Sequence, residues 1–202
     1  MFLFVQNYQN EYCCDWTISL ADSLTVIGAV IAFFIALHQY KKAQKWKRTE
    51  FILSYYSNIL NSFNVKRGMR MLDWNRIGIP LEDGEIEGKN NFWFDDDLLR
   101  SSLRNHFEMR DTDGFSDKES IVRLVMDEFL EKLGACYPFI KTKLIKKEDI
   151  TGDIIYWISI IGDVNNKSKD AITRKQLWNY VVAYKYENII SLCKLFGYTI
   201  DK

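Results

Sequence analysis

Residues 23–40 constrain the fold more than any other segment, because eighteen consecutive positions carry no formal charge. Their sequence, SLTVIGAVIAFFIALHQY, is mostly apolar. At about 1.5 Å of rise per residue, a helix of this length covers about 27 Å, enough to cross the hydrocarbon core of a bilayer. The pattern predicts a single transmembrane helix over residues 22–40.

Two other readings of this segment are weaker. A core helix of a soluble protein should show a polar stripe, whereas Thr25 is the only polar side chain between positions 24 and 37. A cleaved signal peptide should begin with basic residues, but only Glu11, Asp15 and Asp22 are charged before the apolar run. The mean hydropathy of the whole chain is −0.20, so a protein with many spans is excluded.

Charge on the two sides of the segment predicts its orientation. Acidic residues precede it, and a basic cluster follows at Lys41, Lys42, Lys45, Lys47 and Arg48. By the positive-inside rule, residues 1–21 lie outside and residues 41–202 form a cytoplasmic domain. The lipid bilayer is therefore the first predicted partner.

Small residues recur every four positions within the predicted span, at Gly28, Ala32 and Ala36. Such a face permits close contact between membrane helices, so it predicts a packing face for a homo-oligomer. Self-association through the helical domain is the other route to an oligomer. No protein partner is identified by these patterns.

Charge and cysteine content exclude several functions. The 27 basic and 27 acidic residues cancel, so no global field attracts nucleic acid, and no nucleic-acid partner is predicted. The four cysteines form no C-x-x-C motif. We expect Cys136 and Cys193 to be small core residues, while Cys13 and Cys14 lie on the predicted outer side, where interchain disulfides are the alternative.

Apolar residues beyond the span recur mostly at helical spacing, and only two prolines interrupt the chain. The first helix is predicted to continue to about Asn61, with an apolar stripe, and a shorter helix follows over residues 65–75. Residues 76–91 are rich in glycine and predict a β-hairpin or an extended loop pair. The residues expected on the stripe, or buried by the shorter helix, are Trp46, Ile52, Leu53, Tyr55, Tyr56, Ile59, Leu60, Phe63, Met69, Leu72 and Trp74 or Met71.

Several helix ends are marked by capping residues. Asp95 or Asp96 is expected to cap one helix, and Ser116 with Glu119 forms a capping box at the start of another. The last helix is predicted over residues 171–196, ending at Gly197. Its expected buried residues are Trp178, Val182, Ile189, Cys193 and Phe196. The predicted fold is mainly α, with the N-terminal transmembrane helix continuing into a cytoplasmic helical bundle with a small β-hairpin or loop insertion.

Carboxylates offer one candidate for chemistry, around Asp95, Asp97, Glu108 and Asp111. The three consecutive acids at 95–97 cannot share one helical face. Acidic residues complement the dipole of a helix N-terminus, so a structural role is favoured for them. A calcium loop at residues 111–122 fails because its glycine falls at position four instead of six. Only two histidines occur, so no histidine zinc site is expected. We predict no cofactor, no metal and no catalytic residue.

Four stretches of the chain carry a resemblance: QYKKAQKWKRTEFI, GMRMLDWNRI, KKEDITGDIIYWISII and LWNYVVAYKYENIISLCKLFGY. With the N-terminal span, they resemble a group of uncharacterised bacterial proteins of about 200 residues with one span and a cytosolic helical domain. The resemblance implies a bacterial inner membrane and no particular activity. The leading hypothesis is a non-enzymatic membrane-anchored interaction or effector module, of a defence or toxin type. The alternative is a membrane-tethered enzyme with the carboxylate metal site.

Overall fold

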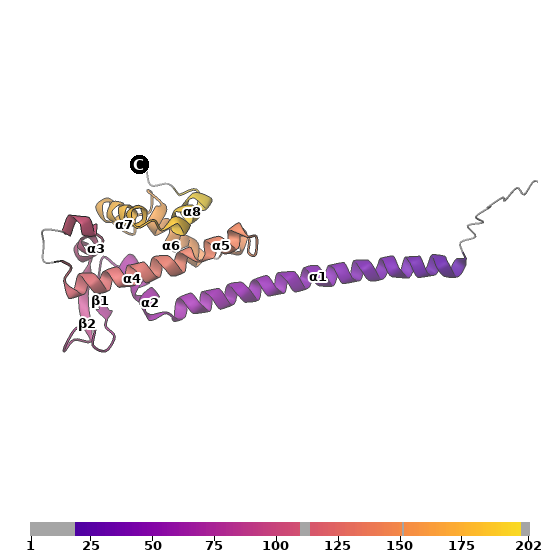
Figure 1. The fold of residues 1–202 in the computed structure, drawn as a ribbon, viewed down its shortest axis with the longest axis horizontal. Coiled ribbons are helices and arrows are strands. Elements are labelled where there is room, and N and C mark those ends of the chain that lie inside the picture. The colour runs from indigo at the N-terminus through magenta and orange to yellow at the C-terminus, as the bar shows by residue number, and fades with distance from the viewer. Residues whose placement is uncertain (1–18, 110–113, 151, 199–202) are drawn as a thin grey trace, which may run out of the picture. The chain divides into compact units, whose positions relative to one another are not determined.

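The computed structural model describes residues 19–109, 114–150 and 152–198, and these are mainly α-helical with one small antiparallel sheet (Figure 1). The predicted fold class is confirmed. The chain divides into two compact units, Met1–Trp46 and Lys47–Lys202. The predicted outer cysteines, Cys13 and Cys14, lie outside the described residues.

Helix α1 runs without interruption from Leu20 to Asn61, as the sequence predicts. Ser19 and Asp22 exchange hydrogen bonds at its start, which satisfies amide groups of the first turn. No side chain of its most apolar 18-residue window is buried, so this segment is not a core helix of the described chain. Among the described residues, one helix, near the N-terminus, is long and apolar enough to span a membrane.

The apolar stripe predicted along α1 is wrong at its first positions. Trp46 is 72% exposed and Leu53 is 64% exposed. The packed face is the neighbouring row of the helix, where Tyr55 is half-buried and Ile59 is buried. Tyr55 donates a hydrogen bond of 2.6 Å to the Lys132 carbonyl oxygen, and this contact fixes which face of α1 turns inward.

Helix α2 (Phe63–Asp73) leads into the hairpin of β1 (Arg76–Pro80) and β2 (Asn91–Asp95). Met71 and Leu72 are buried in α2, whereas Trp74 follows the helix and is exposed. The strands pair Ile77 with Phe94 and Ile79 with Phe92 on the inner face, and Gly78 with Trp93 on the outer face. The hairpin reading of residues 76–91 is thus confirmed, because alternation places one apolar face against the core.

Helices α3 (Asp96–Ser102) and α4 (Asp117–Gly134) begin at the predicted caps. Asp95 accepts a hydrogen bond from the Leu98 amide, and Ser116 and Glu119 form the reciprocal capping box. Helix α4 packs against α2, α3, α5 and α8 and is central to the bundle. In the view of Figure 1, the hairpin and α6–α8 lie on opposite sides of α4.

The C-terminal part consists of α5 (Cys136–Lys141), α6 (Gly152–Gly162), α7 (Ala171–Ala183) and α8 (Glu187–Phe196). Two short 3-10 turns complete the described elements: η1 (His106–Met109) lies between α3 and α4, and η2 (Lys147–Asp149) lies between α5 and α6. Gly197 ends α8 in the left-handed conformation, as predicted. The single last helix predicted over residues 171–196 is wrong, because Lys185 adopts a positive φ of 56° and separates α7 from α8.

This break changes which residues are buried. Val182 is 49% exposed and Trp178 is half-buried, whereas both were expected in the core. Tyr180 is buried instead, and its hydroxyl group and that of Tyr186 both donate to Asp127 Oδ1. The reversal after α7 brings these two hydroxyl groups onto one carboxylate, and this explains why the helix does not continue.

Candidate functional site

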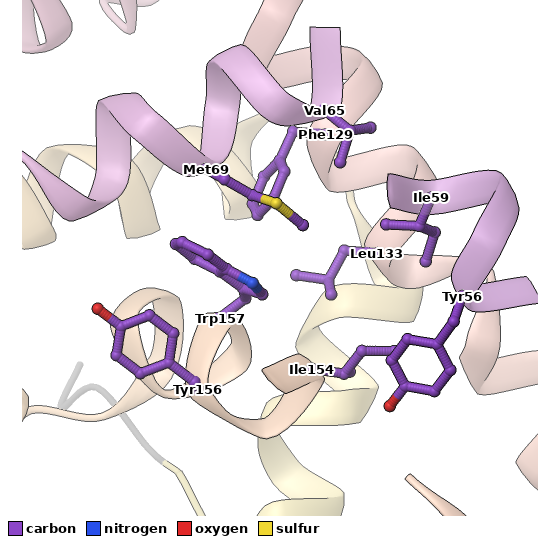
Figure 2. Close-up of a pocket in the computed structure, with 9 residues that line it drawn as sticks. All are labelled: Tyr56, Ile59, Val65, Met69, Phe129, Leu133, Ile154, Tyr156 and Trp157. Carbon is purple, nitrogen blue, oxygen red and sulfur yellow. The ribbon is translucent and has the colours of Figure 1, made fainter. Parts of the chain in front are cut away.

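An apolar cavity of about 310 Å³ lies within the Lys47–Lys202 unit, where four helices meet (Figure 2). It is formed by the end of α1 together with α2, α4 and α6. No charged side chain lines it. Its lining residues are Tyr56, Ile59, Val65, Met69, Phe129, Leu133, Ile154, Tyr156 and Trp157.

The aromatic side of the cavity is held by ring contacts from α6. Trp157 packs edge-on against Phe129 of α4, with 5.9 Å between ring centroids, and edge-on against Tyr156 at 4.8 Å. Tyr156 is 40% exposed and lies toward solvent, and its hydroxyl group donates a 2.6 Å hydrogen bond to Asp73 Oδ1. This bond ties α6 to the end of α2 and raises the pKa of Tyr156, since the carboxylate disfavours a second negative charge.

Close packing of α2 on α4 sets the adjoining wall of the cavity, which Phe129 also lines. A Cβ atom added to Gly68 would lie 2.9 Å from the Phe129 Cβ atom, so the two helices approach through this glycine. Phe129 is 1% exposed and Leu133 is 2% exposed, and both reach the cavity from α4. The cavity therefore depends on helices that are far apart in the sequence.

A buried arginine that sequence reasoning missed stabilises the same helix α2. Arg67 is 1% exposed, and its guanidinium group donates to both carboxylate oxygens of Glu85, at 2.6 and 2.8 Å. Asn64 and the Pro80 carbonyl oxygen accept its remaining hydrogen bonds. This two-pronged pair connects α2 to the loop between the strands, and bidentate geometry makes it one of the stronger types of ion pair.

The Arg67 pair predicts a dependence of stability on acid. Hydrogen bonds from Arg67 lower the pKa of Glu85 below its usual 4.5, so the stabilisation is complete above about pH 4.5 and is lost as pH falls through the lower value of the folded state. We expect the free energy of unfolding of the full chain to fall between pH 5 and pH 3. In Glu85→Gln it should be lower at pH 7 and fall less steeply, as measured by urea unfolding. An equally steep fall in this variant would contradict the assignment to Glu85.

The described carboxylates of the candidate site make contacts that stabilise the fold. Asp95 caps α3, and Asp97 pairs with Arg100 one turn later. Asp96 accepts a 2.6 Å hydrogen bond from Lys169, whose side chain is fully buried. Asp111 and the side chain of Glu108 lie outside the described residues. In residues 19–109, 114–150 and 152–198, no group of three histidine, cysteine or acidic side chains is placed to hold a metal ion.

The predicted membrane-associated residues occupy α1. Gly28, Ala32 and Ala36 lie in its apolar segment, and a Cβ atom added to Gly28 meets no atom within 4 Å. Four of the five basic residues, Lys41, Lys42, Lys45 and Lys47, are exposed. The fifth, Arg48, is half-buried and lies 3.7 Å from the Asp149 carboxylate, so it belongs to the helical domain.

The two described cysteines are not reactive groups. Cys136 and Cys193 are both fully buried and free, as expected for small core residues. Burial raises the pKa of the Cys136 thiol to about 11 and that of Cys193 to about 12, so neither forms a thiolate at neutral pH.

The sequence analysis also did not predict the cluster of aromatic rings around Arg123. The guanidinium group lies over the rings of Phe115, Tyr180 and Tyr184, at 4.6 to 4.9 Å from their centroids. It also donates hydrogen bonds to the Ser102 and Arg104 carbonyl oxygens. These contacts hold the segment after α3 against α4 and α7. They give the Arg123 guanidinium group a structural role.

Comparison with known proteins adds no assignment to this geometry. No protein-family model, no curated protein and no solved structure matches the chain.

Proposed function

We propose that the chain is a non-enzymatic, membrane-anchored interaction or effector module of a bacterial inner membrane. Residues 22–40 of helix α1 are its single span, residues 1–21 lie outside, and the domain from residue 41 is cytoplasmic. The observation that carries the proposal is the apolar segment of α1, in which no side chain of the 18-residue window is buried. The exposed basic residues Lys41, Lys42, Lys45 and Lys47 support this orientation.

The continuity of α1 supports a role beyond tethering. The helix that contains the apolar segment also supplies Tyr56 and Ile59 to the wall of the cavity. The small-residue face of Gly28, Ala32 and Ala36 lies on the same helix. A change of packing at Tyr56 or Ile59 therefore acts on the helix that carries this face. We propose that clustering through this face perturbs the bilayer.

Growth and membrane potential of bacteria expressing the full chain test this function. We expect growth arrest with depolarisation, reported by a potential-sensitive dye. The variant Asp95→Asn/Asp97→Asn/Glu108→Gln/Asp111→Asn should retain both effects, since Asn caps a helix about as well as Asp. Gly28→Leu/Ala32→Leu should weaken both effects while still inserting into the membrane.

Three results would count against the proposal. Loss of the effects in the carboxylate variant would favour the membrane-tethered enzyme. Full effects in the Gly28→Leu/Ala32→Leu variant would show that the small-residue face is incidental. The orientation would be overturned if a reporter that works only in the periplasm were active when fused after Lys202.

A further inference from the structure

One polar group faces the cavity without a partner, and it is the indole N–H of Trp157. The side chain is 8% exposed, and its nitrogen points toward the middle of the lining residues in Figure 2. None of the hydrogen bonds among the described residues uses this N–H. Among the described residues, the buried side-chain nitrogens without a partner belong to Arg48 and Arg174, so the Trp157 N–H stays accessible from the cavity. An acceptor atom of a ligand in the cavity can therefore take this hydrogen bond.

The remaining lining defines the rest of the ligand. Aliphatic side chains such as Ile59, Val65 and Leu133 dominate the wall, and no lysine or arginine lines it. A buried carboxylate or phosphate would have no cation to offset the cost of its desolvation. The volume of about 310 Å³ is at the lower end of the range for small-molecule sites, which suits one small molecule and not a two-chain lipid.

We propose that this cavity binds a neutral small molecule with an aryl or alkyl body and a single carbonyl-type oxygen, which accepts the Trp157 N–H. The body of the ligand packs between α1, α2 and α4, against Ile59, Val65 and Phe129. The ring contacts of Trp157 with Phe129 and Tyr156 hold the donor in place before the ligand enters. The proposal does not depend on the membrane role of α1.

Acetophenone and ethylbenzene form a matched pair of probes, because they share a shape and differ in the carbonyl group. The full chain, held in amphipol and labelled with nitrogen-15 in its six tryptophans, is titrated with each probe and followed through the indole N–H signals. The Trp157 signal is assigned from its absence in Trp157→Phe. Acetophenone should move this signal downfield in a saturable way, and ethylbenzene should bind without the downfield shift.

Three variants complete the test. Trp157→Phe lacks the reporter signal, so its binding is followed through the NMR signals of the probe by saturation transfer. It should bind acetophenone up to about tenfold more weakly and ethylbenzene unchanged, as expected for one hydrogen bond. Ile154→Phe keeps the N–H but fills the cavity, so it should abolish binding of both probes. Trp93→Phe, on the exposed outer face of the hairpin, should behave like the wild type.

Three results would overturn the proposal. The first is a Trp157 signal that does not respond to acetophenone. The second is an equal response of all six indoles, and the third is a response that persists in Ile154→Phe; each of these two shows that the probe partitions into the amphipol or binds elsewhere. None of the three results bears on membrane insertion, which is measured separately.

Discussion

Asp96→Ala should destabilise the helical domain by about 3–5 kcal/mol, the usual cost of removing one partner of a buried ion pair. Lys169 is fully buried, and its ammonium group donates to Asp96 Oδ1 at 2.6 Å and to the Trp74 carbonyl oxygen at 2.8 Å. Without this carboxylate, the ammonium group keeps the Trp74 carbonyl oxygen, the ring of Phe94 and the charges of Asp170 and Asp73, to which it makes no hydrogen bond. Chemical unfolding at pH 7 measures the loss. A loss of less than about 1 kcal/mol, the cost typical of an exposed ion pair, would contradict this role.

Neighbouring residues provide the controls. Asp97→Ala removes a carboxylate that is 85% exposed, so it should cost less than about 1 kcal/mol. The double variant Asp96→Leu/Lys169→Met removes both charges and should recover most of the stability, because apolar residues often replace a buried pair without loss. A double variant as unstable as Asp96→Ala would show that packing, and not the unpaired charge, determines the effect.

The pH dependence of Asp96→Ala gives an independent check. Burial already lowers the pKa of Lys169 from its usual 10.5, and removal of Asp96 should lower it further. The penalty for a buried charge is complete below the folded-state pKa and is relieved as pH rises above it. The variant should therefore approach the wild type in stability as pH is raised from 7 toward 10.

Local signals predicted the elements that short-range physics determines. The capping box of Ser116 and Glu119 satisfies backbone amide groups within one turn, so it can be read directly from the sequence. Asp95 and Gly197 mark helix ends for similar reasons. The glycine-rich stretch at 76–91 predicted the hairpin because glycine and proline mark turns between short extended segments.

Features that depend on distant partners could not be predicted in this way. Arg67 and Lys169 are basic residues of types that normally lie at the surface, and their burial depends on Glu85 and Asp96, which lie 18 and 73 residues away along the chain. The break at Lys185 has no glycine or proline to mark it, and Asp127 on α4 supplies the contacts that stabilise it. Trp178 and Val182 were misplaced because the predicted helical register continued through this break.

The cavity could not be predicted from the spacing of apolar residues along the sequence. Trp157 on α6 and Ile59 on α1 are both buried apolar residues, and the sequence predicted only Ile59 on a packed face. The empty volume between them results from how four helices meet, and no single periodicity describes it. The orientation of the Trp157 nitrogen likewise depends on the rings of Phe129 and Tyr156.

The double variant Val30→Arg/Phe34→Arg should abolish membrane insertion. Both side chains are exposed in the apolar segment of α1, near its middle, and they lie one turn apart. Each arginine at the centre of a span costs about 2.5–3.5 kcal/mol, so two cost about 5–7 kcal/mol, which lowers insertion by about four to five orders of magnitude. Positions 30 and 34 lie opposite the face of Gly28 and Ala32, so loss of helix contact does not confound the result.

Alkaline extraction of membranes from cells expressing the full chain measures this effect. The wild type and the matched variant Val30→Leu/Phe34→Leu should stay in the membrane pellet, and the double-arginine variant should move to the supernatant. The helical domain should remain folded in all three, because no side chain of the apolar window is buried. A double-arginine variant that stays in the pellet would show that α1 is not the membrane anchor and that contacts of the Lys47–Lys202 unit hold the protein at the membrane.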